Sequence, residues 1–206
     1  MQTMKLVCFA DVHGYDFDLP DGDVLIFAGD FGGFGSEDEA IKFANKLKSF
    51  KHRYKIVVAG NHDRIFENGP ENAKKIFSGI IYLQDSSVVI EGRTFYGSPW
   101  SREFNNWAFN LPEDKLKEKF SLIPKEVDVL ITHAPPFSIC DKDIYGSNLG
   151  EKPLLEVVKK IKFKYHIFGH IHQGYGKKVV GKKTYLNVSL VNDLYYMVNK
   201  PVVIEL

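Results

Sequence analysis

Short apolar runs, bounded by turn-forming residues, alternate with amphipathic stretches along the first half of the chain. Residues 6–10 and 24–28 are uninterrupted apolar runs, and each is followed closely by an acidic residue. Such runs are typical of strands that are buried on both faces of a sheet. Residues 54–59 indicate a third strand. The pattern therefore predicts a sheet whose strands are joined by helices.

Three stretches have the apolar spacing of amphipathic helices. Residues 36–50 begin at Ser36, which can cap the first turn, and a glutamate follows three residues later as in a capping box. Residues 112–120 and 153–161 each begin with proline, which the first turn of a helix favours. A further short helix is expected after Pro70.

The second half of the chain is richer in strands. Residues 88–90 and 94–96 predict a hairpin around a Glu-Gly-Arg turn. Further strands are expected at residues 127–132, 165–168, 177–180, 184–188 and 202–205. The early alternation and the later strand cluster favour the α/β (α+β) class with mixed sheets. Because no repeat or linker interrupts the pattern, we predict a single domain over residues 1–206.

Composition narrows the possible functions. The 206 residues are 44% hydrophobic, and 27 basic against 26 acidic residues give a net charge of +1. This balance offers no basic surface for long nucleic acid or for a membrane. Only about five apolar residues precede Asp11, too few for a signal peptide, and the two cysteines lie far apart. We expect a cytoplasmic protein with a small substrate, and its oligomeric state stays open.

Histidine is concentrated where the predicted strands end. Five of the seven histidines directly follow apolar runs, namely His13, His62, His133, His170 and His172. Carboxylate and amide side chains accompany them at Asp11, Asp30, Asn61 and Asp63. Because open α/β sheets place their sites at the carboxyl ends of strands, these side chains are expected to lie together. Imidazole combined with carboxylate suits divalent ions such as Mn, Fe and Zn.

Each of these clusters also has an ordinary structural explanation. Asp-x-His, Gly-Asp and Asn-His-Asp can be turn residues alone. Gly-His-x-His is more specific, because alternate residues of an extended segment place both imidazoles on one side. Five clusters in this order, each at a strand end, are hard to explain by turn formation. Together they predict a metal site.

The ordered set resembles the calcineurin-like metallophosphoesterases. The motifs that carry the resemblance are Asp11-x-His13, Gly29-Asp30, Gly60-Asn61-His62-Asp63, His133 and Gly169-His170-x-His172. The segments at residues 97–100, 107–112 and 165–176 resemble more narrowly the metallophosphodiesterases of animal brain, a branch similar to class III cyclic-nucleotide phosphodiesterases. Some mammalian members have glycine at the position of His170, so the histidine here implies a complete centre.

The resemblance implies a four-layer αββα sandwich of two mixed β-sheets flanked by helices. It also implies a dinuclear metal centre. The first metal is expected on Asp11, His13, His172 and Asp30, and the second on Asp30, Asn61, His133 and His170. Manganese is the expected metal, with Fe, Zn, Ni and Co as alternatives.

General chemistry supports these roles. Two neighbouring cations repel each other, and a shared carboxylate such as Asp30 offsets that repulsion. Asn61 supplies a neutral oxygen, which leaves net positive charge for a phosphate. On this hypothesis a metal-bridging hydroxide attacks phosphorus.

Two residues of the Gly-Asn-His-Asp turn are predicted to be catalytic. His62 is expected to donate a proton or a charge-assisted hydrogen bond to the leaving oxygen. Asp63 is expected to fix the tautomer of that imidazole. Of the remaining histidines, His166 is predicted to pack or to hydrogen-bond in the interior, and His52 to lie on a solvated face.

The aromatic segment at residues 100–109 has two interpretations. Trp100, Phe104, Trp107 and Phe109 can form a wall that stacks a nucleobase. Alternatively, they form a hydrophobic flap that seals the core. The sequence slightly favours this second interpretation.

The expected function is metal-dependent hydrolysis of phosphoester bonds, on small and cyclic-nucleotide-like phosphodiesters. A phosphomonoesterase or a nuclease of the same superfamily is the first alternative. The second is a non-catalytic, protein-binding scaffold. Such a scaffold would be expected to have lost metal ligands, whereas this chain keeps all of them.

Overall fold

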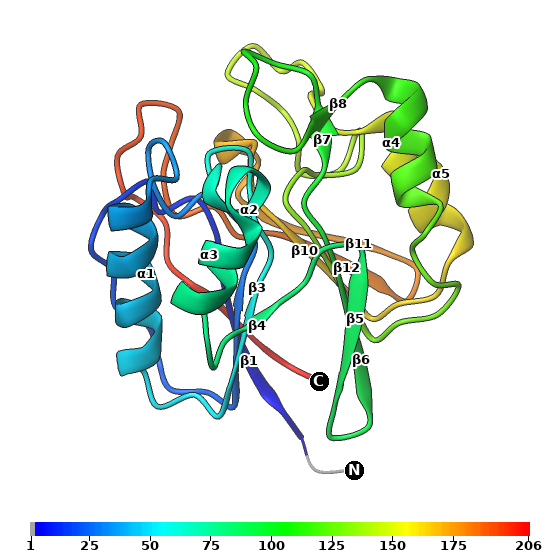
Figure 1. Ribbon diagram of the computed structural model, residues 1–206. Coiled ribbons are helices and arrows are strands. Elements are labelled where there is room, and N and C mark those ends of the chain that lie inside the picture. Colours follow the sequence, from blue (N-terminus) through cyan, green and yellow to red (C-terminus); the bar gives the residue numbers. More distant parts are fainter. Residues whose placement is uncertain (1–2) are drawn as a thin grey trace.

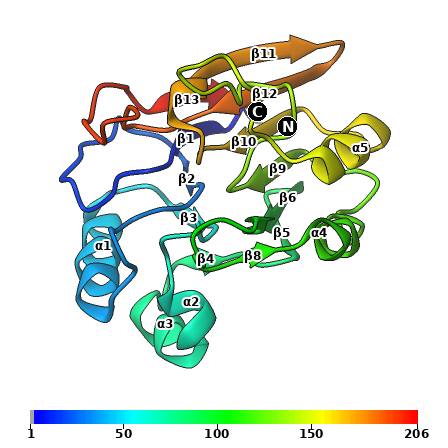
Figure 2. The same cartoon turned by 90° about the horizontal axis from the view of Figure 1, so that it is seen from above.

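Two large β-sheets lie face to face in the computed structural model, and helices cover their outer faces (Figures 1 and 2). The structure describes residues 3–206, so residues 1 and 2 of the predicted domain lie outside the described residues. Both sheets combine parallel and antiparallel pairs. The predicted four-layer sandwich of mixed sheets is confirmed.

The first sheet is mainly parallel. In spatial order it contains β13 (Val202–Glu205), β1 (Lys5–Phe9), β2 (Val24–Phe27), β3 (Tyr54–Val57) and β4 (Ile81–Tyr82). Strands β1 to β4 run parallel, and β13 joins the edge antiparallel. The parallel strands therefore end at the same edge of the sheet.

The second sheet has a parallel centre and antiparallel margins. In spatial order it contains β11 (Gly176–Val180), β12 (Lys183–Asn187), β10 (Tyr165–Phe168), β9 (Val129–Thr132), β6 (Arg93–Ser98) and β5 (Ser86–Ile90). The predicted hairpin is the β5–β6 pair. Two short strands that sequence reasoning missed, β7 (Ser101–Arg102) and β8 (Asn110–Leu111), form a separate parallel pair.

The helices of the described residues are α1 (Glu37–Ser49), α2 (Ile65–Asn68), α3 (Pro70–Ile76), α4 (Glu113–Phe120), α5 (Lys152–Lys160) and a 3₁₀ turn, η1 (His172–Gly174). The four predicted helices, α1, α3, α4 and α5, form within a residue or so of their expected positions, whereas α2 and the 3₁₀ turn η1 were not predicted. Ser36 and Glu39 form the predicted capping box at the start of α1. Within residues 3–206, none of the helices has the length and apolar content needed to cross a bilayer.

Alternation along the strands creates two apolar layers. Leu6 and Cys8 of β1 belong to the core between the sheets, whereas Phe9 packs with the residues under the helices. Both faces of the central strands are buried, which explains their uninterrupted apolar sequences. A rigid, fully packed sheet pair therefore holds the loops at the carboxyl ends of its strands, at the top of Figure 1.

The prediction that His52 lies on a solvated face is wrong. Its side chain is only 5% exposed and packs edge-on against Phe50, with ring centroids 6.2 Å apart. Lys51 and Arg53 on either side are exposed. The charged neighbours in the sequence concealed a side chain that turns inward.

The predicted interior role of His166 is confirmed. Its Nε2 lies 2.8 Å from the hydroxyl of Thr132, which in turn donates to the carbonyl of Ala134 at 2.7 Å. Burial lowers the pKa of His166 to about 3. The neutral ring can donate through Nε2, whereas a second proton on Nδ1 would find no partner among the described residues.

This burial predicts a pH-dependent stability. The unfolded chain protonates His166 below about pH 6.5, whereas the folded chain does so only near pH 3. The contribution to the free energy of unfolding is therefore complete above pH 6.5 and falls as the pH drops, by about 2 kcal/mol at pH 5. Denaturant unfolding of chelator-treated protein at pH 7.5 and pH 5 measures the loss. In His166→Gln, which keeps a donor without titrating, the loss is expected to be smaller; equal losses would contradict the prediction.

Candidate metal centre

All seven predicted metal ligands lie together where strands of the two sheets end. Asp11 and His13 follow β1, Asp30 follows β2, Asn61 follows β3, His133 follows β9, and His170 and His172 follow β10. Both sheets thus contribute ligands to one site. The two carboxylates are almost completely buried, with Asp11 0% and Asp30 2% exposed.

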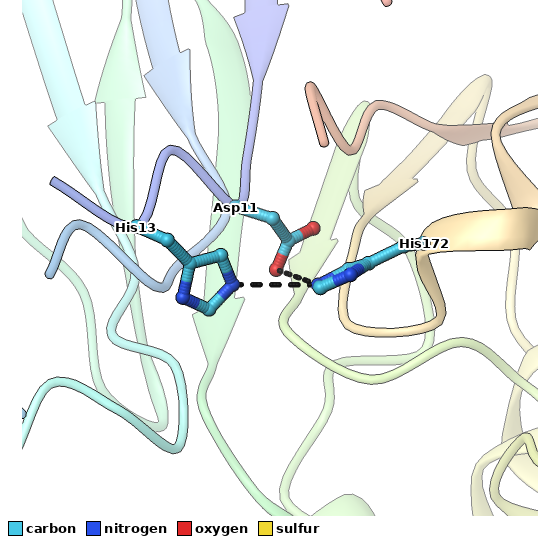
Figure 3. Close-up of side chains that lie close together, drawn as sticks. All are labelled: Asp11, His13 and His172. Carbon is cyan, nitrogen blue, oxygen red and sulfur yellow. Dashed lines mark hydrogen bonds and ion pairs between the residues drawn. The ribbon is translucent and has the colours of Figure 1, made fainter. Parts of the chain in front are cut away.

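Three of these side chains form a first group, Asp11, His13 and His172 (Figure 3). Nε2 of His13 lies 3.3 Å from Nε2 of His172, and that nitrogen lies 3.8 Å from Oδ1 of Asp11. Their ligand atoms all fall within 4.8 Å of one another. Figure 3 shows the three side chains converging from the end of β1 and from the segment after β10.

A second group consists of Asp30, His133 and His170, with Asn61 beside it. Nε2 of His133 lies 3.4 Å from Oδ2 of Asp30 and 2.8 Å from Oδ1 of Asn61. The same Oδ2 lies 3.8 Å from Nε2 of His13 in the first group. Asp30 therefore stands between the two groups, as a shared ligand requires.

Backbone carbonyls orient two of the imidazoles. Nδ1 of His133 donates to the carbonyl of Ala28 at 2.9 Å, and Nδ1 of His172 donates to the carbonyl of Asn192 at 3.0 Å. Each bond leaves Nε2 unprotonated in the neutral ring. Outer hydrogen bonds of this kind fix the tautomer of metal-binding histidines.

The backbone of the site is strained. Asp11, His13, Asp30 and His170 all have left-handed φ angles, between 43° and 66°. Left-handed residues other than glycine are uncommon and gather at functional sites, where the surrounding structure holds them. The strain here turns the chain sharply at each strand end and directs the side chains into the centre.

Two glycines allow this close approach. A Cβ on Gly60 would overlap the carboxylate of Asp30, and a Cβ on Gly169 would overlap that of Asp11. Each glycine thus lies against a candidate ligand from a neighbouring loop. Glycine beside the ligand motifs is explained by this contact.

The electrostatics of the second group fit a cation. Burial opposes ionisation of Asp30, but the adjacent imidazoles, His133 first, hold the pKa of its carboxyl well below the usual range. Burial opposes the protonation of His133 as well, yet Asp30 raises the pKa of that imidazole to about 9. The nitrogen faces two oxygen acceptors, so a positive charge is needed between them. A proton meets this need in the metal-free protein, and a divalent ion would meet it better.

Burial favours the neutral form of two other imidazoles, His13 and His170. Burial lowers the pKa of His13 to about 4, although Asp30 and Asp11 oppose the change. Burial, followed by the neighbouring His133, lowers the pKa of His170 well below its usual range. Neutral imidazoles and ionised carboxylates are the forms that bind divalent metals. The donor set therefore fits the two predicted ions.

The family follows from comparison with known proteins. The family model of the calcineurin-like phosphoesterases matches residues 4–174, most of the chain. The chain belongs to the calcineurin-like phosphoesterases. The predicted family is thereby confirmed, and with it the general activity of a metallophosphoesterase-superfamily hydrolase. The family also implies a dinuclear divalent-metal centre.

Two relatives and a solved structure illustrate the match. "Metallophosphoesterase domain-containing protein 1" of Homo sapiens is 39% identical over 98% of this chain and 71% of its own length. "UPF0046 protein T07D4.2" of Caenorhabditis elegans is 36% identical over 98% of this chain and 60% of its own length. The crystal structure of TT1561 of Thermus thermophilus superposes with a TM-score of 0.63 at 12% identity, covering 94% of this chain and 91% of that chain. At such an identity the solved structure shows the fold alone.

In this phosphoesterase the Gly-His-x-His segment is not extended, contrary to the prediction. His170 has a φ of 65°, and His172 begins the 3₁₀ turn η1. The two imidazoles reach different groups of the centre, because a left-handed residue and a tight turn separate them. Both imidazoles therefore lie in the candidate centre, but not through the simple alternation that the sequence suggested.

The predicted role of Asp63 also needs correction. Its two carboxylate oxygens accept hydrogen bonds from the backbone N–H groups of Asp30, Phe31 and Gly60, at 2.7 to 2.9 Å. Nδ1 of His62 instead donates to the carbonyl of Gly33 at 2.7 Å. The buried carboxylate of Asp63 thus links the turns after β2 and β3 by hydrogen bonds. The backbone carbonyl of Gly33, and not Asp63, fixes the tautomer of His62. Burial and the neighbouring Asp30 raise the pKa of Asp63 well above its usual range, although its backbone bonds oppose this.

His62 lies at the edge of the centre. One of its ring nitrogens falls within 4.8 Å of the ligand atoms of His13 and Asp30, so the imidazole is placed to contact either a bound ion or a substrate. Its backbone N–H donates to Oδ1 of Asp30 at 2.8 Å. Because Gly33 occupies Nδ1, Nε2 is the nitrogen left for the cavity.

A cavity of about 460 Å³ opens over the centre. Asp30, Asn61, His62, His170 and His172 line its floor, and its walls include Arg102, Phe104, Trp107, Leu149 and Tyr195. A volume of this size accommodates a small-molecule ligand.

The aromatic segment divides between the core and the cavity. Trp100 and Phe109 are buried, 9% and 0% exposed, and belong to the core. Phe104 and Trp107 line the cavity, and Phe104 is 65% exposed. The sequence could not show which of these aromatic side chains are buried and which line the cavity, because burial follows no regular period within a loop.

Tyr195 is a wall residue that sequence reasoning missed. Its ring meets His13 and His172 edge-on, with centroids 4.8 and 5.2 Å away. Its φ of 62° is left-handed, and its N–H donates to the same carbonyl of Asn192 that orients His172. No motif surrounds this tyrosine, so only the left-handed turn in space identifies it.

The shared position of Asp30 predicts that one substitution weakens both metal sites. Asp30→Ala removes the carboxylate next to both groups, and elemental analysis after dialysis against manganese is expected to find both ions lost together. His172→Ala, which removes a ligand from the first group alone, serves as the control and should retain the second ion. Loss of a single ion from Asp30→Ala would exclude the bridging role.

Proposed function

We propose that this phosphoesterase is a manganese-dependent phosphodiesterase that hydrolyses small diesters, including cyclic nucleotides. The observation that carries the proposal is the pair of His/Asp groups that meet at Asp30 on the floor of a small cavity, with His62 at its edge. Asp11, His13, Asp30 and His172 would hold one ion, and Asp30, Asn61, His133 and His170 the other. Manganese suits a set that combines four imidazoles with carboxylate and amide oxygens.

Divalent ions held in such a set supply Lewis acidity and acidify the attacking water. The remaining steps belong to the protein. The buried, backbone-tethered ligands keep the positive charge in place, so little reorganisation is needed as negative charge grows on the phosphoryl oxygens. The neutral amide of Asn61 adds an oxygen without further negative charge and thus favours anion binding.

His62 is suited to protonate the leaving oxygen. The carbonyl of Gly33 holds Nδ1–H at 2.7 Å and directs the ring, so that Nε2 of the protonated imidazole can donate to the substrate. The residue lies in the cavity wall beside the metal-binding groups. Proton donation matters most where the leaving alkoxide is strongly basic.

The walls of the cavity favour a diester over a monoester. A monoester dianion would benefit from a cationic side chain beyond the metals, and among the described residues Arg102 is the one lysine or arginine that lines the cavity. Its guanidinium is already engaged by Glu151 at 3.3 Å and by the carbonyls of Leu149 and Gly150. Phe104, Trp107, Leu149 and Tyr195 present apolar surface instead. Such walls suit the organic substituents of a diester.

A substrate screen tests the proposal. Chelator-treated protein is expected to be inactive and to regain activity with manganese but much less with magnesium, which prefers an all-oxygen set. Rates with nucleotide monoesters, cyclic nucleotides and linear diesters then rank the substrates. Faster monoester hydrolysis would favour a phosphomonoesterase, and inactivity on every ester despite full metal content would favour a scaffold.

Substitution of His62 tests its role as an acid. His62→Ala is expected to keep its manganese and to lose about a hundredfold to ten-thousandfold in kcat, because the general acid is removed. The loss should be larger for an alkyl leaving group than for 4-nitrophenolate, which needs no proton. Loss of metal in place of rate would identify His62 as a ligand.

A further inference from the structure

Of the two ring contacts described for His62, the contact with Trp107 has the shorter distance between centroids. The indole stacks on the imidazole with centroids 4.0 Å apart and an interplanar angle of 29°. His13 also contacts the imidazole, but edge-on, at 4.8 Å and 89°. One face of His62 is therefore covered by Trp107, while its edge is fixed by the bond from Nδ1 to Gly33.

The turn that carries His62 also holds the loop that carries Trp107. The backbone N–H of Ala108 donates to the carbonyl of Asn61 at 3.0 Å. The guanidinium of Arg64 donates to the carbonyl of Asn106 at 2.9 Å and lies over the indole, 5.0 Å from its centre. Two hydrogen bonds and a cation–π contact thus tie residues on both sides of Trp107 to residues on both sides of His62.

The backbone of this loop is strained, which indicates that its shape is enforced. Asn105, Asn106 and Phe109 have left-handed φ angles of 50°, 53° and 55°. Asparagine tolerates this region, but phenylalanine does so at a cost that the surroundings must offset. The N–H of Phe109 donates to the carboxylate of Glu67 at 3.0 Å, and its ring is fully buried. The anchor at Phe109 places Trp107 over the cavity.

We propose that Trp107 is a positioning residue for His62 and thereby sets the rate of leaving-group protonation. This inference rests on the proposed function of His62 as an acid. A stacked indole restricts rotation about the side-chain bonds of the histidine, a restriction that the bond to Gly33 and the edge contact with His13 do not supply by themselves. The stack and the bond together define the direction of Nε2, and errors of about 1 Å in such a position can cost about a hundredfold in rate.

A double-mutant cycle between Trp107 and His62 tests the proposal. In manganese-loaded enzyme, Trp107→Ala is expected to lower kcat by about tenfold to a hundredfold, which exceeds any rise in KM from the loss of a wall residue. The loss should be greater for an alkyl than for a 4-nitrophenyl leaving group, as in His62→Ala. Added to His62→Ala, the same substitution is expected to have almost no effect, because the group it positions is gone.

Conservative variants and a measurement independent of activity complete the test. Trp107→Phe, which keeps an aromatic face, should restore most of kcat, whereas Trp107→Leu, which fills space without one, should not. In the NMR spectrum of zinc-loaded protein, the carbon-bound ring protons of His62, assigned with His62→Ala, should lose their ring-current shift in Trp107→Leu. Should Trp107→Ala fail to fold, Trp107→Leu takes its place in the cycle.

The failures are distinguishable. An unchanged kcat in the Trp107 variants, independent losses that multiply with that of His62→Ala, or a raised KM as the main effect would overturn this inference while leaving the proposed phosphodiesterase intact. A wild-type enzyme that hydrolyses no ester would overturn the proposed function, and the NMR shift would then still report whether the stack exists.

Discussion

The structure depends on burying negative charge between two sheets. Asp11 and Asp30 stand at the ends of adjacent strands with almost no exposed surface, and burial of an unpaired carboxylate is costly. Imidazoles from the other sheet, His133 above all, face Asp30 and supply the compensating groups. The junction of the sheets is thus electrostatically incomplete without positive charge. Cation binding and the packing of the sandwich are therefore parts of one constraint, and a cation that binds only the folded chain stabilises it.

The fold could be predicted because its determinants are local. Uninterrupted apolar runs identified the central strands, and the capping residues of α1 identified its first turn, because burial and capping act through neighbours in the sequence. The short strands β4, β7 and β8 were missed, since two-residue pairings carry no periodic signal. His52 was misplaced for a related reason. The charge of its neighbours says nothing about which way one side chain turns.

The candidate site was predictable to the extent that ligands need particular residue types at strand ends. The residue types of the candidate ligands could be read from the sequence, but the hydrogen-bond partners around them could not. Asp63 links two turns by accepting hydrogen bonds from backbone N–H groups. The carbonyl of Gly33 fixes the tautomer of His62, the role that the sequence suggested for Asp63. Backbone carbonyls belong to every residue, so no sequence pattern reveals them as partners. Trp107 was visible as part of an aromatic segment, whereas Tyr195 had no signal, because its role comes from a left-handed turn.

A single turn after β3 connects all these features. Asn61 faces the second candidate metal-binding group, and His62 faces the cavity. Asp63 ties the turn to the end of β2, and Arg64 holds the loop of Trp107. Consecutive residues of a tight turn point in different directions, so one segment can serve several functions that strand residues, restricted to two faces, could not combine. The cost is that these functions are not independent. A change in the Trp107 loop acts on the same backbone that carries a candidate metal ligand, Asn61, which is why only a coupling measurement can separate positioning of His62 from disturbance of the centre.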